Sequence, residues 1–191
     1  MPSPRAFFVS GARMKTRDMA YISISAALIA LCAWLSIPAA IPFTMQTFAV
    51  FAVSGTLGAR RGALALGVYI LLGALGLPVF SGFQGGPGAL LGATGGYIVG
   101  FLPAALIAGL GAEHLGRSLP ALIFSMCAGL LACYALGTAW YVAVYARAGE
   151  AAGVQSVLAA CVVPFIPADA AKIFLAAVLS KRLAPLCSRS A

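Results

Sequence analysis

The chain has 191 residues, of which 62% are hydrophobic and 8% are charged, and its mean hydropathy is +1.03. A soluble domain is about 45–50% apolar and about 25% charged, so this composition excludes a single water-exposed globule and indicates a membrane protein. The net charge of +8 does not indicate nucleic-acid binding, because the cations stand at the edges of apolar runs, as Arg60, Arg61, Lys181 and Arg182 do. The length allows one domain.

Residues 1–18 contain too short an apolar stretch for a signal peptide, and we expect a cytosolic N-terminal tail there. Six apolar runs follow, near the roughly 20 residues that a helix needs to cross the hydrocarbon core. They cover residues 19–37, 44–58, 62–76, 91–110, 119–145 and 154–179. The runs lack the alternation of barrel strands. We therefore predict an all-α membrane protein with six transmembrane helices in a single domain over residues 19–183, followed by a cytosolic tail over residues 184–191.

Lysine and arginine predict the orientation of these helices, because cytosolic loops carry an excess of both. With the N-terminus in the cytosol and six crossings, only Arg147 lies outside and Lys172 belongs to neither side. The ten cations that lie inside are Arg5, Arg13, Lys15, Arg17, Arg60, Arg61, Arg117, Lys181, Arg182 and Arg189. We therefore expect both termini to be cytosolic.

The second run begins with "AIPFTMQTFAV" at residues 40–50. Phe43, Thr44, Gln46 and Thr47 mix aromatic and neutral polar side chains. Such a mixture suits a polar ring ligand, whose faces stack and whose edges form hydrogen bonds. A helix cap at the membrane interface explains the same residues about as well.

A glycine-rich stretch, "GLPVFSGFQGGPGALLGATGGYIVGF", occupies residues 76–101 and carries no charge from Leu77 to Val99. It lacks the GK[ST] ending of a phosphate-binding loop, and no strand precedes it. An uncharged outer loop of this kind could fold back over a cavity, and its glycine N–H groups could hold an anion such as a carboxylate. The alternative is a flexible turn followed by tight helix packing.

The sixth run contains "PFIPADAAKIF" at residues 164–174, with Asp169 and Lys172 among apolar neighbours. A charge at membrane depth costs about 2.5–3.5 kcal/mol even on lenient insertion scales. The spacing of three residues places both side chains on one helix face, so they could merely neutralise each other as a buried ion pair. Because alanines would pack there without this cost, we favour a polar cavity with a ligand.

Two prolines in the same run, Pro164 and Pro167, deprive the preceding turn of hydrogen-bond donors. In a membrane such irregular backbone persists only inside protein or along a cavity. Pro167 could start a new half-helix, since proline suits the first helical turn, and the positive end of the helix dipole would then favour an ionised Asp169. A simple proline kink is the alternative.

Metal sites and catalytic sites are not expected from this sequence. Its five cysteines form no CxxC pair and His114 is the single histidine, whereas a zinc site needs closely spaced Cys and His ligands. The sequence also lacks a Walker motif and the residue sets of intramembrane proteases. We therefore expect no enzyme activity and no cofactor.

Three of these stretches, "IPFTMQTFAV", "GLPVFSGFQGGPGALLGATGGYIVGF" and "PADAAKIFLA", resemble the biotin transporter family BioY in order and content. The resemblance covers residues 20–179. Members of this family are the substrate-binding S components of energy-coupling factor (ECF) transporters. The resemblance implies a six-helix fold in the inner membrane of a bacterium, which captures biotin from the extracytoplasmic side.

The resemblance also implies roles for individual residues. Asp169 would accept a hydrogen bond from a ureido N–H of biotin. Lys172 would either donate to the ureido carbonyl or pair with the carboxylate of the ligand, and both assignments stay open. The implied walls of the site are Phe43, Gln46, Phe80, Gln84 and Tyr97, and the backbone of Gly85 and Gly86 is a possible lid.

The partners implied by the resemblance are biotin, a transmembrane T component, two ATPase subunits and membrane lipid. Ala26, Ala30 and Ala33 form a small-residue face on the first run, which lets another helix approach closely. The resemblance implies that Ala26 and Ala30 dock on the T component, and packing within the same bundle is the alternative. An S component for a different vitamin and a structural membrane protein are the rival functions.

Overall fold

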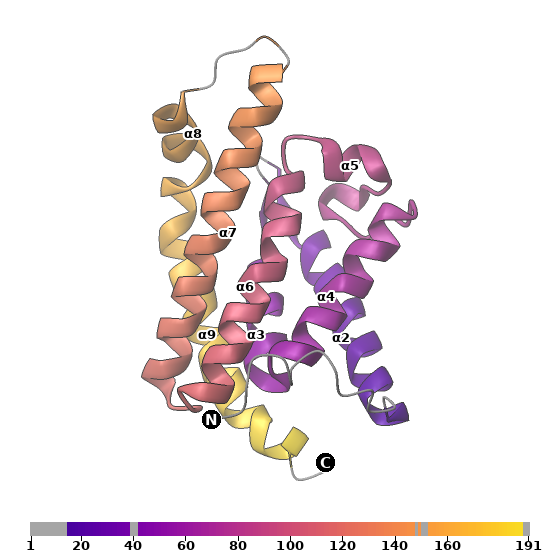
Figure 1. Cartoon of the computed structure of the whole chain (residues 1–191), viewed down its shortest axis with the longest axis vertical. Helices are drawn as coiled ribbons and strands as arrows, with labels where there is room; N and C mark the ends of the chain where they lie inside the picture. Colours follow the sequence, from indigo (N-terminus) through magenta and orange to yellow (C-terminus); the bar gives the residue numbers. More distant parts are fainter. Residues whose placement is uncertain (1–14, 39–41, 148, 150–152, 189–191) are drawn as a thin grey trace, which may run out of the picture.

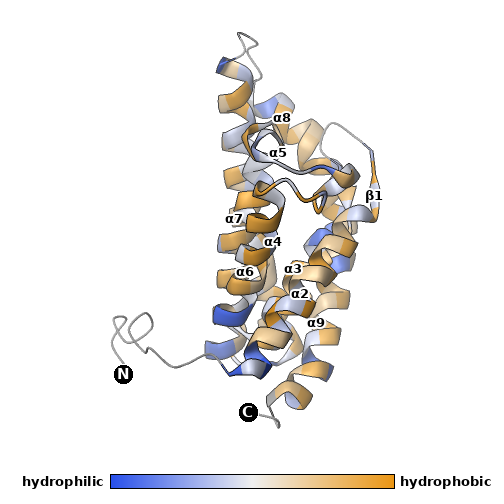
Figure 2. Ribbon diagram, turned by 90° about the vertical axis from the view of Figure 1, so that its right-hand side faces the viewer, coloured by the Kyte–Doolittle hydropathy of each residue, from blue (hydrophilic) through white to orange (hydrophobic). Residues whose placement is uncertain are grey.

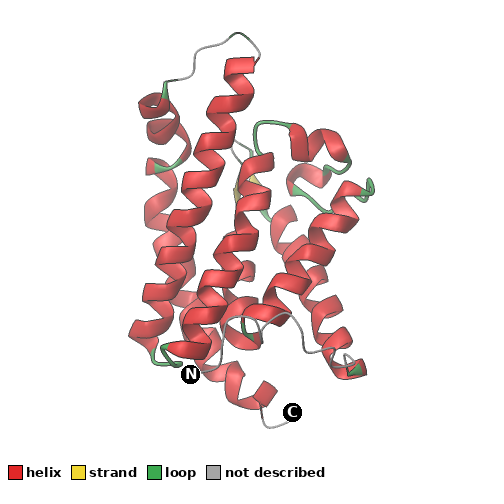
Figure 3. Cartoon of the chain, viewed as in Figure 1, coloured by secondary structure: helices red, strands yellow, loops and turns green. Residues whose placement is uncertain are grey.

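The computed structural model describes residues 15–38, 42–147, 149 and 153–188 (Figure 1). Most of the expected N-terminal tail and the last three residues lie outside these ranges. Helices make up most of the described chain (Figure 3). In chain order the elements are α2 (Thr16–Trp34), β1 (Ser36–Ile37), β2 (Phe43–Thr44), α3 (Gln46–Leu57), α4 (Ala59–Ala74), η1 (Ser81–Phe83), α5 (Pro87–Leu91), α6 (Gly95–His114), α7 (Leu119–Arg147), α8 (Val154–Cys161), η2 (Val163–Phe165) and α9 (Ile166–Ser188).

Four helical stretches of the described chain are long and apolar enough to cross a membrane: α2, α6, α7 and the joined stretch Gln155–Cys187. In Figure 2 the colour of hydrophobic residues covers most of the length of the helices. This agrees with the all-α membrane class expected from composition. The helices α3 and α4 have 12 and 16 residues, which is short for a span, so the count of six crossings stays a prediction.

The helices do not end where the apolar runs end. The helix α2 begins at Thr16, inside the segment predicted as an N-terminal tail, and α9 continues to Ser188 through most of the predicted C-terminal tail. Hydropathy marks the part of a helix that suits lipid, whereas backbone hydrogen bonds can extend the same helix into a polar flank where water solvates the side chains.

The sixth apolar run is broken at its prolines, as the half-helix interpretation predicts. The helix α8 ends at Cys161, and Val162 has φ −124° and ψ −55°, outside helical geometry. One 3₁₀ turn, η2, follows, and α9 begins at Ile166. Pro167 therefore lies in the first turn of α9, where its missing N–H has no helical partner to lose. Asp169 lies in the same first turn.

The helix α3 forms the centre of the bundle. All its residues from Gln46 to Thr56 except Phe48 are buried, because α9, α6 and α4 pack around it. Close approach of α9 requires Gly55, since a Cβ at this position would meet the hydroxyl of Ser180. Ser180 in turn donates a hydrogen bond to the carbonyl of Ala52 at 3.3 Å. These contacts hold the C-terminal half of α3 against the part of α9 around Ser180.

The first residues of α2 and the last residues of α9 lie at one end of the bundle, and α5 and α8 lie at the other end (Figure 1). At the first end Asp18 forms an ion pair with Arg61 at 2.7 Å, which joins α2 to α4. Glu113 accepts a hydrogen bond from the N–H of Ala59 at 2.8 Å, which joins α6 to the start of α4. Polar contacts therefore tie the helices together at the end opposite α5 and α8.

Candidate functional site

A cavity of about 240 Å³ lies between α3, the 77–86 loop, α6, α7 and the broken segment that joins α8 to α9. For comparison, an apolar cavity of about 150 Å³ binds benzene, so this space admits a fused two-ring ligand. Its neutral polar lining consists of Thr44, Gln46, Thr47, Ser81, Gln84, Thr94, Tyr97 and Tyr134. Its other uncharged lining consists of Pro42, Phe80, Ile98, Phe101, Leu130, Cys133, Cys161 and Phe165. The charged lining consists of Asp169 and Lys172.

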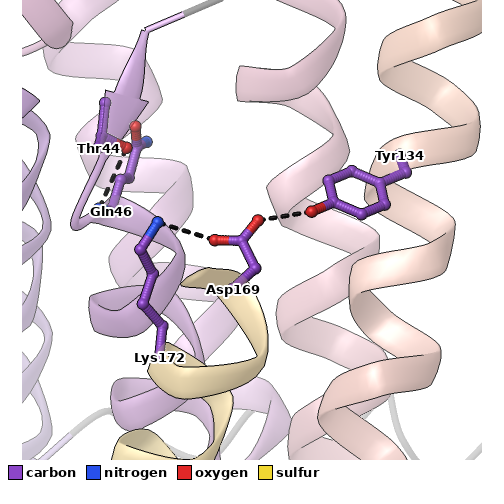
Figure 4. A network of polar contacts seen from close by, with 5 residues as sticks. All are labelled: Thr44, Gln46, Tyr134, Asp169 and Lys172. Carbon is purple, nitrogen blue, oxygen red and sulfur yellow. Dashed lines mark hydrogen bonds and ion pairs between the residues drawn. The ribbon is translucent and has the colours of Figure 1, made fainter. Parts of the chain in front are cut away.

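Asp169 and Lys172 form a buried ion pair on the cavity wall. The Nζ of Lys172 donates to Oδ1 of Asp169 at 2.8 Å. The hydroxyl of Tyr134, on α7, donates to Oδ2 at 2.6 Å. Figure 4 shows the carboxylate between these two donors, which come from different helices. Each oxygen of Asp169 thus has one partner, and its position and orientation are determined by α7 and α9 together.

Phe43 packs against the side chain of Lys172 and is not among the residues that line the cavity. The Nζ of Lys172 lies 3.8 Å from the centroid of the Phe43 ring, within the range of a cation–π contact. The same ring packs against Phe165 with a centroid separation of 5.8 Å. Phe43 thus packs directly on a residue of the cavity lining, and its role as a wall of the site stays a prediction.

Gln46 and Phe80 line the cavity, and Tyr69 supports both of them. The side-chain amide of Gln46 donates to the hydroxyl of Tyr69 at 3.2 Å. The ring of Phe80 meets the ring of Tyr69 edge-on at 5.5 Å and 77°. Gly73 makes room for Phe80, because a Cβ there would overlap the Phe80 ring. The side chains of α3 and of the 77–86 loop are thereby packed on α4.

Tyr97 and Gln84 also line the cavity. The hydroxyl of Tyr97 shares a hydrogen bond with Thr138 at 3.4 Å, which joins α6 to α7. The backbone carbonyl of Gln84 accepts from the N–H of Phe80 at 3.0 Å, and this bridge closes the loop around η1. Four of the expected walls, namely Gln46, Phe80, Gln84 and Tyr97, are therefore brought together around one space.

Gly85 and Gly86 do not line the cavity. The N–H of Gly86 donates to the carbonyl of Gly73 at 2.7 Å, and a Cβ at Gly85 would meet the carbonyl of Leu77. The two glycines thus tie the end of the loop to the end of α4. Their lack of side chains permits this close backbone approach, and the lid role of their backbone stays a prediction.

The alanine face of α2 is inside the bundle. Ala26 is 4% exposed and Ala30 is 8% exposed, and both belong to the core formed with α3 and α4. Within the single chain these two side chains are therefore covered, and their docking on a T component stays a prediction. Their small side chains let α2 approach α3 and α4 closely.

The sequence matches the BioY family over residues 8–189. The chain belongs to the BioY family. It is 40% identical over 171 residues to the biotin transporter BioY of Thermotoga maritima, covering 89% of this chain and 97% of that protein. It is 36% identical over 171 residues to the probable biotin transporter BioY of Pyrococcus horikoshii, covering 89% and 98%. The family predicted from the three motifs is thus confirmed.

A solved member of the same fold is the crystal structure at 2.1 Å of an S component for biotin from an ECF-type ABC transporter. The TM-score is 0.79 at 24% identity, and the match covers 90% of this chain and 94% of that chain. This similarity shows that the two chains share their fold over most of their length.

Two residues that line the cavity of this BioY family member, Tyr134 and Ser81, are not predicted by the sequence analysis. Tyr134 is one tyrosine within a long apolar run, and its pairing with Asp169 depends on the packing of α7 against α9. Ser81 is one small residue in a glycine-rich loop, and its place in the cavity lining depends on how the loop turns. The one available signal was the cost of an unpaired hydroxyl in a membrane helix, which predicts a partner for Tyr134 without naming it.

Proposed function

We propose that this protein is the biotin-binding S component of an ECF transporter and captures biotin from the extracytoplasmic side within the membrane. The observation that carries the proposal is the buried Asp169–Lys172 pair on the wall of a cavity. Support also comes from relatives named biotin transporters at 36–40% identity over most of the chain. Burial of two charges next to an internal space is expensive unless a ligand uses them.

The chemistry of the pair suits the ureido ring of biotin, which offers two N–H donors and one carbonyl acceptor. A carboxylate has about four lone-pair positions, so Asp169 can accept a ureido N–H while it keeps Lys172 and Tyr134. Lys172 has three N–H donors, of which one points to Asp169 and the ring of Phe43 takes up another. The remaining donor is available for the ureido carbonyl.

The charge of the cavity favours the ureido carbonyl as the partner of Lys172 over the carboxylate of the ligand. Among the described lining residues, the charges of Asp169 and Lys172 cancel. A neutral ureido head group keeps this balance. A carboxylate placed at Lys172 would bring a net negative charge into a buried site, close to Asp169, at a large desolvation cost.

The proposal includes six membrane crossings with both termini cytosolic, in the inner membrane of a bacterium. The common position of the start of α2 and the end of α9 supports an even number of crossings (Figure 1). The positions of Arg60, Arg61, Lys181 and Arg182 near that end fit the positive-inside rule. Transport energy would come from a T component and two ATPase subunits, because this sequence has no Walker motif.

Calorimetry on the purified protein in lipid nanodiscs tests the ligand. We expect biotin to bind with 1:1 stoichiometry, and thiamine and riboflavin to give no heat above dilution. Well-folded protein that binds no biotin would refute the proposal, and binding of another vitamin in its place would assign the site to that vitamin. A tag after Ala191, tested for labelling from each side of the membrane, checks the orientation, and labelling from the outside would refute it.

A further inference from the structure

Gln46 presents an amide oxygen without a partner to the cavity. Its side-chain nitrogen donates to the hydroxyl of Tyr69 at 3.2 Å, whereas its side-chain oxygen accepts no hydrogen bond from the residues that the structure describes. This oxygen is not completely enclosed, because Ser81 holds the one fully enclosed side-chain polar atom of the described chain that lacks a partner. Gln46 is 4% exposed and lines the cavity, so the accessible surface of its oxygen belongs to the cavity.

The amide of Gln46 differs from the other neutral polar groups of the lining. An amide oxygen only accepts hydrogen bonds, whereas a hydroxyl group rotates and either donates or accepts. A hydroxyl therefore adapts to the ligand, while an amide held in one orientation selects a donor. Gln84, the other amide of the described lining, is exposed, so water competes for it. Tyr69 is 1% exposed and does not belong to the described lining, and it fixes the amide of Gln46 from α4.

The start of α3 lies beside Lys172. The ring of Phe43, three residues before Gln46, lies 3.8 Å from the Nζ of Lys172. The hydroxyl of Thr44 accepts a hydrogen bond from the N–H of Gln46 at 3.2 Å, which ties the first residue of α3 to β2. Figure 4 shows Gln46 and Lys172 on the same side of the carboxylate of Asp169. A head group placed against the ion pair is therefore next to the first turn of α3.

Asp169, Lys172 and Gln46 together provide an acceptor, a donor and a second acceptor. The ureido ring of biotin carries the complementary groups, with one N–H on each side of its carbonyl. Because these two N–H groups point away from each other, the carboxylate of Asp169 cannot accept both. A buried N–H without a partner is costly. Gln46 supplies the missing acceptor and adds no charge, so the described lining stays neutral.

We infer that Gln46 is a specificity-determining residue whose amide oxygen accepts the second ureido N–H of the bound ligand, and that Tyr69 is a positioning residue that orients this amide. This inference rests on the proposed function. The site accordingly takes cyclic ureas, in which an N–H stands on each side of the carbonyl. It selects against rings of the same shape in which one N–H is replaced by oxygen.

The test measures calorimetric affinities for biotin and for its two cyclic carbamate analogues, in each of which one ring N–H is replaced by oxygen. Gln46→Met keeps the length of the side chain and removes the acceptor. We expect this variant to weaken biotin binding by about 10-fold, because one ligand N–H loses its partner in a buried site. Binding of one analogue should weaken to the same degree. The other analogue lacks the N–H that faces Gln46, so Gln46→Met should bind it at least as well as the parent protein does.

Tyr69→Phe tests the positioning role. It keeps the ring that meets Phe80 edge-on and removes the hydroxyl that holds the amide of Gln46. We expect biotin binding to weaken by about 3-fold, because the released amide can also turn its nitrogen toward the ligand. The analogue that is insensitive to Gln46→Met should be insensitive to Tyr69→Phe as well.

Two further variants separate recognition from folding. The double variant Gln46→Met with Tyr69→Phe removes both partners of one hydrogen bond, so it should melt close to the parent protein. Its loss of biotin affinity should equal that of Gln46→Met alone. Gln155→Met is the matched control, because Gln155 is exposed on α8 and does not belong to the described lining. It should bind all three ligands as the parent does.

Each other outcome overturns the inference. Unchanged biotin affinity in Gln46→Met would show that the amide does not contact the ligand. Equal losses for biotin and both analogues would show that Gln46 shapes the cavity or donates to the carbonyl, and does not accept an N–H. Parent-like binding of all three ligands by Tyr69→Phe would remove the positioning role. If the parent protein does not bind biotin, the proposed function fails and this inference fails with it, whereas normal binding by the parent separates the two.

Discussion

Two acid–base pairs of nearly equal length occupy different surroundings in this protein. Asp18 and Arg61 lie 2.7 Å apart with side chains that are 22% and 31% exposed. Asp169 and Lys172 lie 2.8 Å apart with side chains that are 4% and 5% exposed. The first pair joins two helix starts at the end of the bundle, and the second lies on a cavity wall with Tyr134 as a further donor.

The comparison shows that distance alone says little about the role of an ion pair. An exposed pair contributes about 0.2–1 kcal/mol, because water solvates each partner well when the pair is broken. In a buried pair, removal of one partner costs about 3–5 kcal/mol, because the other charge is left without solvent. The buried pair is therefore a costly arrangement that a membrane protein keeps where the two charges have a task.

The largest effect is expected from changes in the buried pair. Asp169→Asn and Lys172→Ala should each weaken biotin binding by roughly 10- to 150-fold, the loss of one hydrogen bond to a charged group. Each single change also leaves the remaining buried charge without its partner, so the melting temperature should fall. Calorimetry and thermal unfolding on the same preparations measure both quantities.

The double variant Asp169→Asn with Lys172→Ala separates ligand recognition from structural pairing. Because both charges are removed, it should melt close to the parent protein and yet fail to bind biotin. If the double variant folds well and binds biotin with the parent affinity, the pair is structural only and the comparison between the two ion pairs loses its functional meaning.

A smaller effect is expected from Tyr134→Phe, which removes the 2.6 Å hydrogen bond to Asp169 and keeps the ring. The carboxylate retains Lys172 but loses its anchor on α7, so biotin affinity should fall by about 10-fold, near the low end for a hydrogen bond to a charged group. Tyr145→Phe is a suitable control, since Tyr145 stacks on Tyr141 away from the cavity lining. Equal affinity in Tyr134→Phe and Tyr145→Phe would show that α7 does not position Asp169.

Phe43→Leu should have a still smaller effect. It removes the ring that lies 3.8 Å from the Nζ of Lys172, a contact worth about 0.5–1 kcal/mol. Lys172 keeps its bond to Asp169, so we expect biotin affinity to fall by about 2- to 5-fold. Phe124→Leu, at a ring that is 70% exposed, should leave affinity unchanged. A loss above about 30-fold in Phe43→Leu would mean that the ring contacts the ligand directly.

The smallest effect is expected at the partly exposed pair of Asp18 and Arg61. Asp18→Asn should lower the free energy of unfolding by at most about 1 kcal/mol, and less at high salt because the pair is partly exposed. Biotin affinity should stay at the parent value. Thermal unfolding at two salt concentrations, with calorimetry alongside, measures this. A loss of biotin binding in Asp18→Asn would show that the two pairs are coupled and do not act separately.

Part of the site could be predicted because local chemistry determines it. Asp169 and Lys172 share one helix face by their spacing of three residues, and both are costly in lipid. Pro164 and Pro167 predict the break between α8 and α9 through their missing N–H groups. The class of membrane protein follows from composition, since lipid and water select different side chains.

The tertiary structure alone decided which distant residues complete the site. Tyr134 reaches Asp169 because α7 packs on α9, and the ring of Phe43 packs on the ammonium group of Lys172. Ala26 and Ala30 are buried by their own neighbours, a result that a small-residue spacing leaves open, because such spacing suits contact with any helix. Side-chain hydrogen bonds and ring contacts depend on separations of a few ångströms between elements far apart in the chain. Hydropathy and residue spacing along one segment do not determine those separations.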